Sequence, residues 1–123
     1  MKIKTCELTG PALDWAVAKC EDESVRVAGG RVRFALSQFT NDYDLYAPST
    51  DWAQAGPLLQ AEMMEHGMSL SSIDHDRGKF AAYYWSDDFD ELEGIGTTPL
   101  IAAMRALVQR RLGDEIDIPK ELT

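Results

Sequence analysis

The sequence predicts a single α+β domain spanning residues 1–123. In this fold, two β-hairpins form an antiparallel or mixed sheet that packs with an N-terminal helix, a short middle helix and a long C-terminal helix. Apolar residues recur at helical spacing near both ends of the chain, and they alternate with polar residues in two segments between them. The connections are too short for repeated βαβ crossovers. One hydrophobic core suffices, because a chain of this length removes roughly two thirds of its unfolded surface from water.

The first expected helix covers residues 10–20. Thr9 is a candidate N-cap, and Pro11 stands close to the first helical position, where the missing N–H costs no hydrogen bond. The apolar stripe at helical spacing consists of Leu13, Ala16, Val17 and Cys20. This face of the helix is expected to point into the core.

Residues 25–36 change to a period of two and predict the first β-hairpin. Val25 and Val27 alternate with Arg26, and the Gly-Gly step at 29–30 supplies the positive φ angles of a tight turn. The apolar side chains are expected to face inward and the arginines outward, where they need no ligand.

The stretch YAPSTDWAQAGPLL, residues 46–59, predicts a one-turn connector between the hairpin and the middle helix. A hydroxyl or a carboxylate at positions 49–51 can cap the turn. Pro57 disfavours helical geometry at the residue before it. The middle helix is therefore expected to begin at Pro57 and to end at Gly67.

The second half of the chain predicts a second hairpin and the most regular helix. Two short strands within residues 68–85 are joined at HDRG, with Gly78 in the turn. Pro99 opens the C-terminal helix after a threonine cap, and Arg110 and Arg111 suit the negative end of the helix dipole. The alternating EIDIP segment that follows is a candidate edge strand.

Residue types that bind metals are few and scattered. Cys6 and Cys20 form no CxxC pair, and both are expected to be buried thiols. His66 suits the C-terminal end of the middle helix. The DHD run at 74–76 offers one imidazole and two carboxylates, but consecutive strand residues alternate faces and do not converge easily on a metal. We therefore expect no metal site and no cofactor.

Motifs for catalysis are absent from the sequence. The chain has no GxxxxGK[ST] or GxGxxG phosphate loop and no GxSxG nucleophile elbow. Nothing selects a catalytic pair among its 21 acids. An enzyme is therefore less favoured than a binding protein, although a catalytic triad can assemble from distant residues.

The charge of the chain limits its partners. With 21 acids against 12 bases, the formal net charge of −9 repels phosphate backbones and disfavours direct binding of nucleic acid. Five acids gather at Ser86–Glu93, as either a solvated loop or a contact surface for a basic partner. No apolar stretch is long enough to cross a bilayer, and the N-terminus lacks the apolar core of a signal peptide. We expect a cytoplasmic protein without membrane partners, and homo-oligomerisation stays open.

Three long segments carry a family resemblance: MKIKTCELTGPALDWAVAKCE, YAPSTDWAQAGPLL and GTTPLIAAMRALVQRRLGDEIDIPKEL. Together they resemble the phage NinX-like family, small proteins encoded by tailed bacteriophages and prophages. The words PSTDWAQ, TPLIAAMR and LGDEIDIP follow in the family's order and at similar spacing. The resemblance implies a phage accessory protein in a bacterial cytoplasm, and it implies no activity, cofactor or catalytic residue for this chain.

The densest run of polar and aromatic residues lies in the connector and forms the candidate binding surface: Tyr46, Ser49, Thr50, Asp51, Trp52 and Gln54. Three successive hydroxyl or carboxylate side chains exceed what one helix cap requires, and the two aromatic rings suit a partially exposed surface. A capped and packed turn without a binding role is the structural alternative.

Three classes of function follow from these observations. The first is a non-enzymatic phage accessory protein that binds a host or phage protein through the candidate surface. The second is a small-molecule-binding protein or enzyme with a pocket at Tyr46–Gln54, in which Asp51 is the acid or base. The third is an acidic inhibitor that imitates the DNA backbone with the acids of residues 74–93 and 114–121.

Overall fold

The computed structural model describes residues 1–35, 44–74, 76–84 and 93–123. Within these ranges, three α-helices and seven strands in small antiparallel sheets confirm the α+β class. The helices are α1 (Gly10–Cys20), α2 (Trp52–His66) and α3 (Pro99–Leu112). The strands are β1 (Lys2–Lys4), β2 (Val25–Ala28), β3 (Arg31–Phe34), β4 (Met68–Asp74), β5 (Lys79–Tyr84), β6 (Glu93–Gly96) and β7 (Glu115–Asp117). Two 3₁₀ turns are η1 (Thr5–Glu7) and η3 (Lys120–Leu122).

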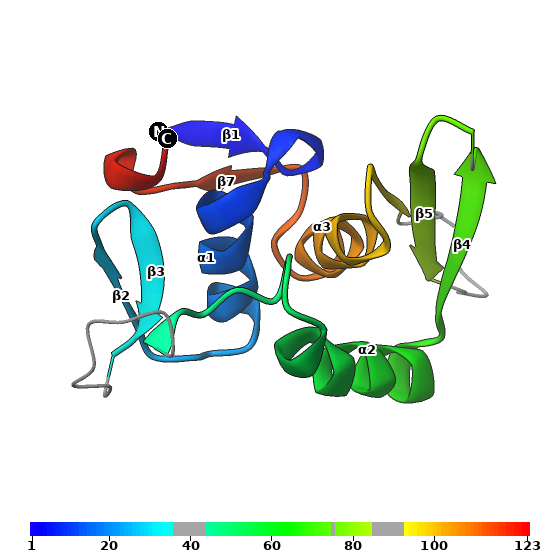
Figure 1. Cartoon of the computed structure of the whole chain (residues 1–123), viewed down its shortest axis with the longest axis horizontal. Helices are drawn as coiled ribbons and strands as arrows, with labels where there is room; N and C mark the ends of the chain where they lie inside the picture. The colour runs from blue at the N-terminus through cyan, green and yellow to red at the C-terminus, as the bar shows by residue number, and fades with distance from the viewer. Residues whose placement is uncertain (36–43, 75, 85–92) are drawn as a thin grey trace.

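The strands divide into three antiparallel sheets. β1 pairs with β7, β2 pairs with β3, and β4, β5 and β6 form the third sheet in that order. Both predicted hairpins are present, β2–β3 and β4–β5, but they do not share a sheet. They stand on opposite sides of α1 and α3 (Figure 1), so each hairpin buries its apolar face against helices.

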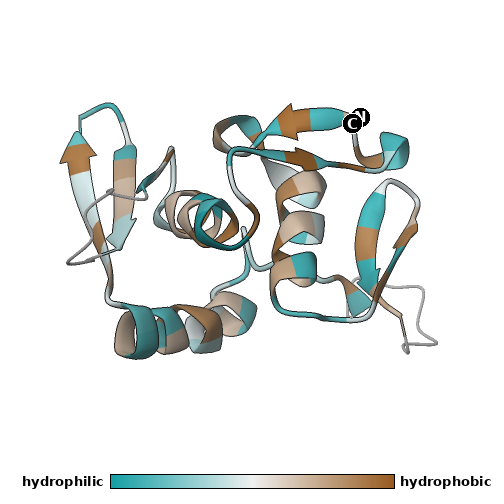
Figure 2. Cartoon of the chain, turned by 180° about the vertical axis from the view of Figure 1, so that it is seen from behind, coloured by the Kyte–Doolittle hydropathy of each residue, from teal (hydrophilic) through white to brown (hydrophobic). Residues whose placement is uncertain are grey.

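The core lies where α1 and α3 pack against each other between the two hairpins. Figure 2 shows the apolar colour along both helices. The larger side chains of these two helices with no exposed surface are Leu13, Val17, Met104, Leu107 and Val108. Thr98 caps α3 by accepting the N–H of Ile101 at 3.1 Å, whereas Thr9 at the start of α1 makes no such hydrogen bond. The periodicity of the sequence therefore located both core helices correctly.

The middle helix differs from the prediction. α2 is the longest helix, with 15 residues, and it begins at Trp52 instead of Pro57. Asp51 is the cap, since its Oδ1 accepts the N–H of Ala53 at 2.9 Å. Pro57 lies inside the helix, where the preceding Gly56 has no Cβ atom to collide with the proline ring. Gly67, at φ +70°, ends the helix as expected.

The two ends of the chain meet in a strand pair that the sequence predicted only in part. The candidate edge strand EIDIP forms β7, and its partner β1 was not expected because the segment KIK contains a single apolar residue. Ile3 lies opposite Ile116, and the N-terminal ammonium binds Asp117 Oδ1 at 2.8 Å. The termini therefore lie side by side (Figure 1).

Strand β6 was also missed, because its glycines resemble a turn. In the structure, Gly94 and Gly96 lie against α3. A Cβ atom at Gly94 would overlap the backbone O of Ala102 and the backbone N of Ala106. The glycines therefore allow the strand to approach the helix backbone, and this contact attaches the third sheet to the core.

We predict that Gly94→Ala lowers the free energy of unfolding by about 3 kcal/mol or more, because the helix backbone cannot yield to the added methyl group. The control is Ser71→Thr, which adds a methyl group to an exposed residue of β4, and it should change stability by no more than about 0.5 kcal/mol. Urea unfolding of both variants checks this. Equal stability of the two variants would contradict the packing described for β6.

Candidate functional site

The connector between β3 and α2 is held in place by the side chain of Gln54. Its amide Nε2 donates to the carbonyl O of Leu45 at 2.8 Å, and its Oε1 accepts the N–H of Ala47 at 2.9 Å. Gln54, in the first turn of α2, therefore fixes the backbone of the connector at Leu45 and Ala47.

Tyr46 is a packing residue at the inner side of this connector. Its side chain is only 6% exposed, and its ring meets Phe34 edge-on at a centroid distance of 5.3 Å. Burial raises the pKa of the Tyr46 hydroxyl above its usual value. The ring that the sequence suggested for a partially exposed surface thus lies mostly inside the protein.

Ser49 brings the connector against Asp14, a buried acid of α1. Asp14 Oδ1 accepts the backbone N–H of Ser49 at 2.8 Å, and Asp14 is 5% exposed. The Ser49 hydroxyl lies near the same carboxyl group and lowers its pKa, but its geometry falls outside that of a hydrogen bond. Among the described residues, the buried Ser49 Oγ therefore has no hydrogen-bond partner.

Sequence reasoning missed Asp14 as a site residue. Its position in the sequence carried a signal. Asp14 stands three residues before Val17 and four before Ala18, so its side chain falls on the apolar side of the helix. A charged side chain on a buried face requires a partner or a function.

A pocket of about 330 Å³ opens beside Asp14. It lies between the first turns of α1, the start of β3 and the connector. The wall of the pocket includes Pro11, Asp14, Arg31, Val32, Leu45, Tyr46 and Thr50. Burial raises the pKa of Asp14 to about 6, although the hydrogen bond from the Ser49 N–H, the nearby Ser49 hydroxyl and the positive charge of Arg31 act in the opposite direction.

The remaining predicted site residues, Thr50, Asp51 and Trp52, lie at the start of α2 and have different roles. Thr50 is exposed, and Asp51 is used as the helix cap, so the Asp51 carboxylate is not the pocket acid that the sequence proposed. Trp52 points outward with 57% of its surface exposed. Tyr46 and Thr50 thus line the pocket, and Trp52 lies at the surface. The side chains of Asp51 and Gln54 form hydrogen bonds with backbone groups.

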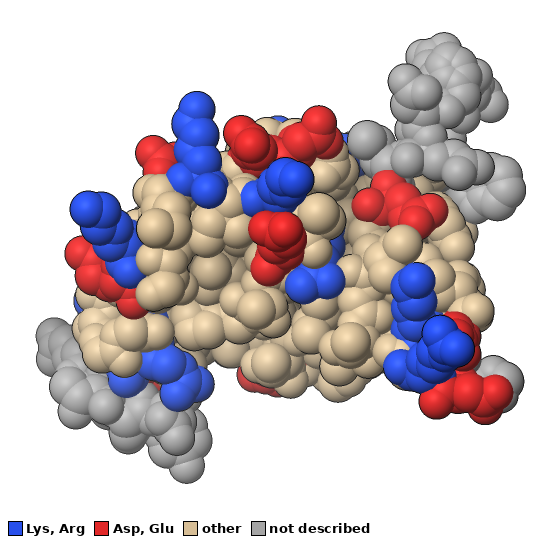
Figure 3. Space-filling model, turned by 90° about the horizontal axis from the view of Figure 1, so that it is seen from above, with Lys and Arg blue, Asp and Glu red and all other residues tan. Residues whose placement is uncertain are grey.

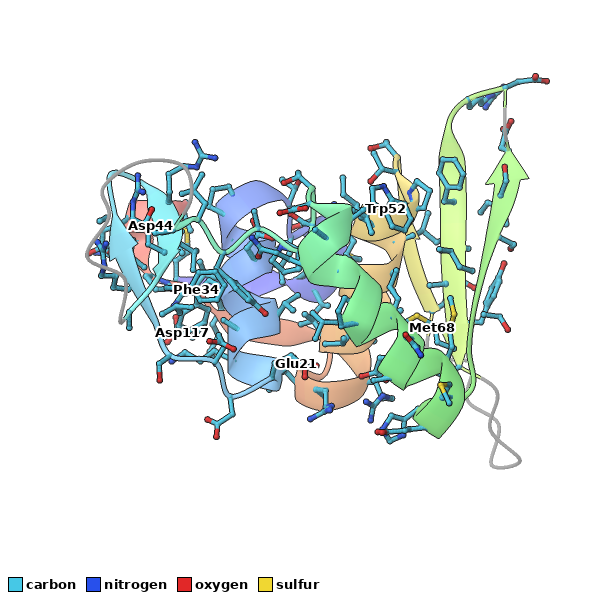
Figure 4. The ribbon with its side chains drawn as sticks, turned by 60° about the horizontal axis from the view of Figure 1, so that its bottom comes forward. Glu21, Phe34, Asp44, Trp52, Met68 and Asp117 are labelled. Carbon is cyan, nitrogen blue, oxygen red and sulfur yellow. The ribbon has the colours of Figure 1, made fainter. Side chains whose placement is uncertain are left out.

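Trp52 begins a solvent-facing surface of α2 that carries no charged side chain over residues 52–64. We call this surface the α2 outer face, and its members are Trp52, Ala53, Pro57, Gln60, Ala61, Met63 and Met64. Met63 is 43% exposed and Met64 is 77% exposed. Figure 4 shows Trp52 at the N-terminal end of α2 and Met68 just beyond its C-terminal end.

The acid of this helix segment, Glu62, is buried and paired. Arg110 Nη2 donates to both carboxylate oxygens at 2.8 Å, and the Tyr84 hydroxyl donates to Oε2 at 3.2 Å. The Arg110 guanidinium also lies 5.2 Å from the centre of the Tyr84 ring. The sequence predicted only that Arg110 suits the negative end of the helix dipole. In the structure, Arg110 of α3 also forms an ion pair with Glu62 of α2.

A third buried acid, Asp44, lies at the entrance to the connector (Figure 4). Its carboxylate accepts hydrogen bonds from Arg26 at 2.9 Å and from Arg33. Arg26 and Arg33 of the first hairpin therefore pair with an acid of the connector, a contact that the sequence did not predict.

Metal-binding residues do not gather in the parts of the chain that the structure describes. No group of three or more His, Cys, Asp or Glu side chains there could hold a metal ion. Cys20 is buried as expected, but Cys6 is exposed, because it stands in η1 at the surface. His75 and residues 86–92 of the acidic stretch lie outside the described residues.

None of the described helices is long and apolar enough to cross a membrane.

We predict that Asp14→Asn changes the pH dependence of stability. The folded pKa of about 6 lies above the ordinary value of 3.8, so the protonated carboxyl stabilises the fold at low pH, and this contribution is lost as the pH rises from 3.8 to about 6. Asparagine does not titrate and keeps an acceptor for the Ser49 N–H. Relative to the wild type, the variant should gain about 2–3 kcal/mol between pH 4 and pH 8. Urea unfolding at both pH values measures this, and parallel pH profiles would contradict it.

Comparison with known proteins supports the resemblance seen in the sequence. A family model described as Bacteriophage P22, NinX matches residues 4–111. Among curated proteins, none matches the chain. Because the family match spans α1, the connector, α2 and most of α3, the chain belongs to the bacteriophage P22 NinX family.

Proposed function

We propose that this protein is a non-enzymatic phage accessory protein that binds a host or phage protein through the α2 outer face. Membership of the NinX family supports a phage accessory protein. The observation that carries the binding proposal is the run of exposed, uncharged side chains that begins at Trp52 and ends at Met64.

An uncharged outer face is unusual for a surface helix. Helices of this kind normally place charged residues toward solvent, and 27% of the residues in this chain are charged. Large apolar side chains exposed together are typical of interaction surfaces. Tryptophan is a common anchor in protein interfaces, and methionine adapts to partners of different shape.

The negative charge of the chain favours a particular kind of partner. Residues 52–123 contain 13 acids and 6 bases, and the net charge of the whole chain is −9. A partner with an apolar patch and basic residues around it would be attracted over a distance and would then bury the uncharged face.

The other two classes of function receive less support. Asp51 is occupied as a helix cap, so it is a poor acid or base for catalysis. On the face drawn in Figure 3, acidic side chains are interspersed with basic ones and form no separate row of negative charge, as imitation of a DNA backbone would require.

Capture of partners from bacterial cells that express phage genes tests the proposed function. We expect Trp52→Ala to weaken binding of the captured partner by at least about tenfold, because an anchor of this type contributes about 2 kcal/mol or more. The matched control is Leu112→Ala, which removes a side chain of 40% exposure from the end of α3 and should leave binding unchanged. Circular dichroism checks that both variants fold. A partner that binds both variants as well as the wild type would refute the α2 outer face as its site.

A further inference from the structure

We propose that the pocket beside Asp14 binds a free amino acid with an apolar side chain, whose ammonium group meets Asp14 and whose carboxylate meets Arg31. This site is separate from the α2 outer face and does not depend on the proposed protein partner. Sequence reasoning placed a pocket acid at Asp51, and the structure provides Asp14 instead.

The acceptor end of the site is incomplete without a ligand. Asp14 uses Oδ1 for the Ser49 N–H, and no described residue donates a hydrogen bond to Oδ2. A buried carboxylate in a pocket wall, with one oxygen that accepts no hydrogen bond from the described residues, suits an ammonium group, which brings both N–H donors and the opposite charge.

The same pocket also carries a positive charge, which is close enough to act on Asp14. Arg31 lines the same pocket and is exposed, and within the described part of the chain it forms no ion pair. Its guanidinium group suits a carboxylate, which it can bind through two parallel hydrogen bonds. A ligand that is only anionic would be repelled by an ionised Asp14, and one that is only cationic would be repelled by Arg31, so a zwitterion satisfies both ends.

The rest of the pocket wall is largely apolar. It includes Pro11, Val32, Leu45 and the ring of Tyr46. The volume of about 330 Å³ is at the small end of the range of ligand pockets. Walls and size therefore favour a side chain such as that of leucine or valine over a larger or charged one.

An NMR titration of the ¹⁵N-labelled full chain with L-leucine tests this inference. We expect millimolar leucine to shift amide signals of residues that line the pocket, such as Val32 and Ala47. Asp14→Asn and Arg31→Gln should each weaken binding by about tenfold or more, because each removes one charge-assisted contact. Lys79→Gln is the control, since it removes an exposed cation from β5, on the far side of α3 (Figure 1), and should leave binding unchanged.

Three analogues of leucine test the two ends of the site separately. 3-Methylbutylamine and leucinamide lack the carboxylate, and 4-methylpentanoate lacks the ammonium group. Each should bind at least about tenfold more weakly than leucine. If leucinamide binds as tightly as leucine, the role of Arg31 is wrong, and if 4-methylpentanoate does so, the role of Asp14 is wrong. Absence of any shift with leucine, valine or methionine on the folded wild type would overturn the proposal.

Discussion

The buried ion pair between Glu62 and Arg110 is the interaction that makes α2 part of the fold. α2 contributes few fully buried apolar side chains, Ala55 and Leu59, so hydrophobic packing alone attaches it weakly. Glu62 is 3% exposed and binds Arg110 through both carboxylate oxygens. Removing one member of such a pair leaves a buried charge without compensation, at a cost of about 3–5 kcal/mol. The pair therefore fixes one side of α2 and leaves the opposite side free for a partner.

Buried acids also hold the connector that precedes α2. Asp44 binds Arg26 and Arg33 of the first hairpin, and Asp14 of α1 binds the backbone of Ser49. A segment without regular secondary structure needs such anchors, because its backbone groups have no ladder of hydrogen bonds. The connector is thereby held against both α1 and β3, and the pocket lies between these three elements.

The sequence predicted what depends on local periodicity and missed what depends on distant contacts. Both core helices, both hairpins and a cap within positions 49–51 follow from spacing and turn residues, and the structure selects Asp51 as the cap. Pro57 was misplaced because the preceding glycine relieves the clash that normally ends a helix. The strand containing Gly94 resembled a turn, since only the α3 backbone explains its glycines. In the candidate site, the exposure of Trp52 agreed with expectation, whereas Asp14 acquires its partner from a residue 35 positions away, which no local pattern reveals.

A helix fixed on one side, its uncharged outer face and the phage family assignment together support the proposal that this protein presents α2 to a partner. The most direct measurement of this claim is site-specific photocrosslinking in bacterial cells that express phage genes. A photoreactive amino acid at Met64, on the α2 outer face, should give a discrete crosslinked product, and the same amino acid at Ile73, an exposed residue of β4, should give none. A product from Ile73 with none from Met64 would contradict the account.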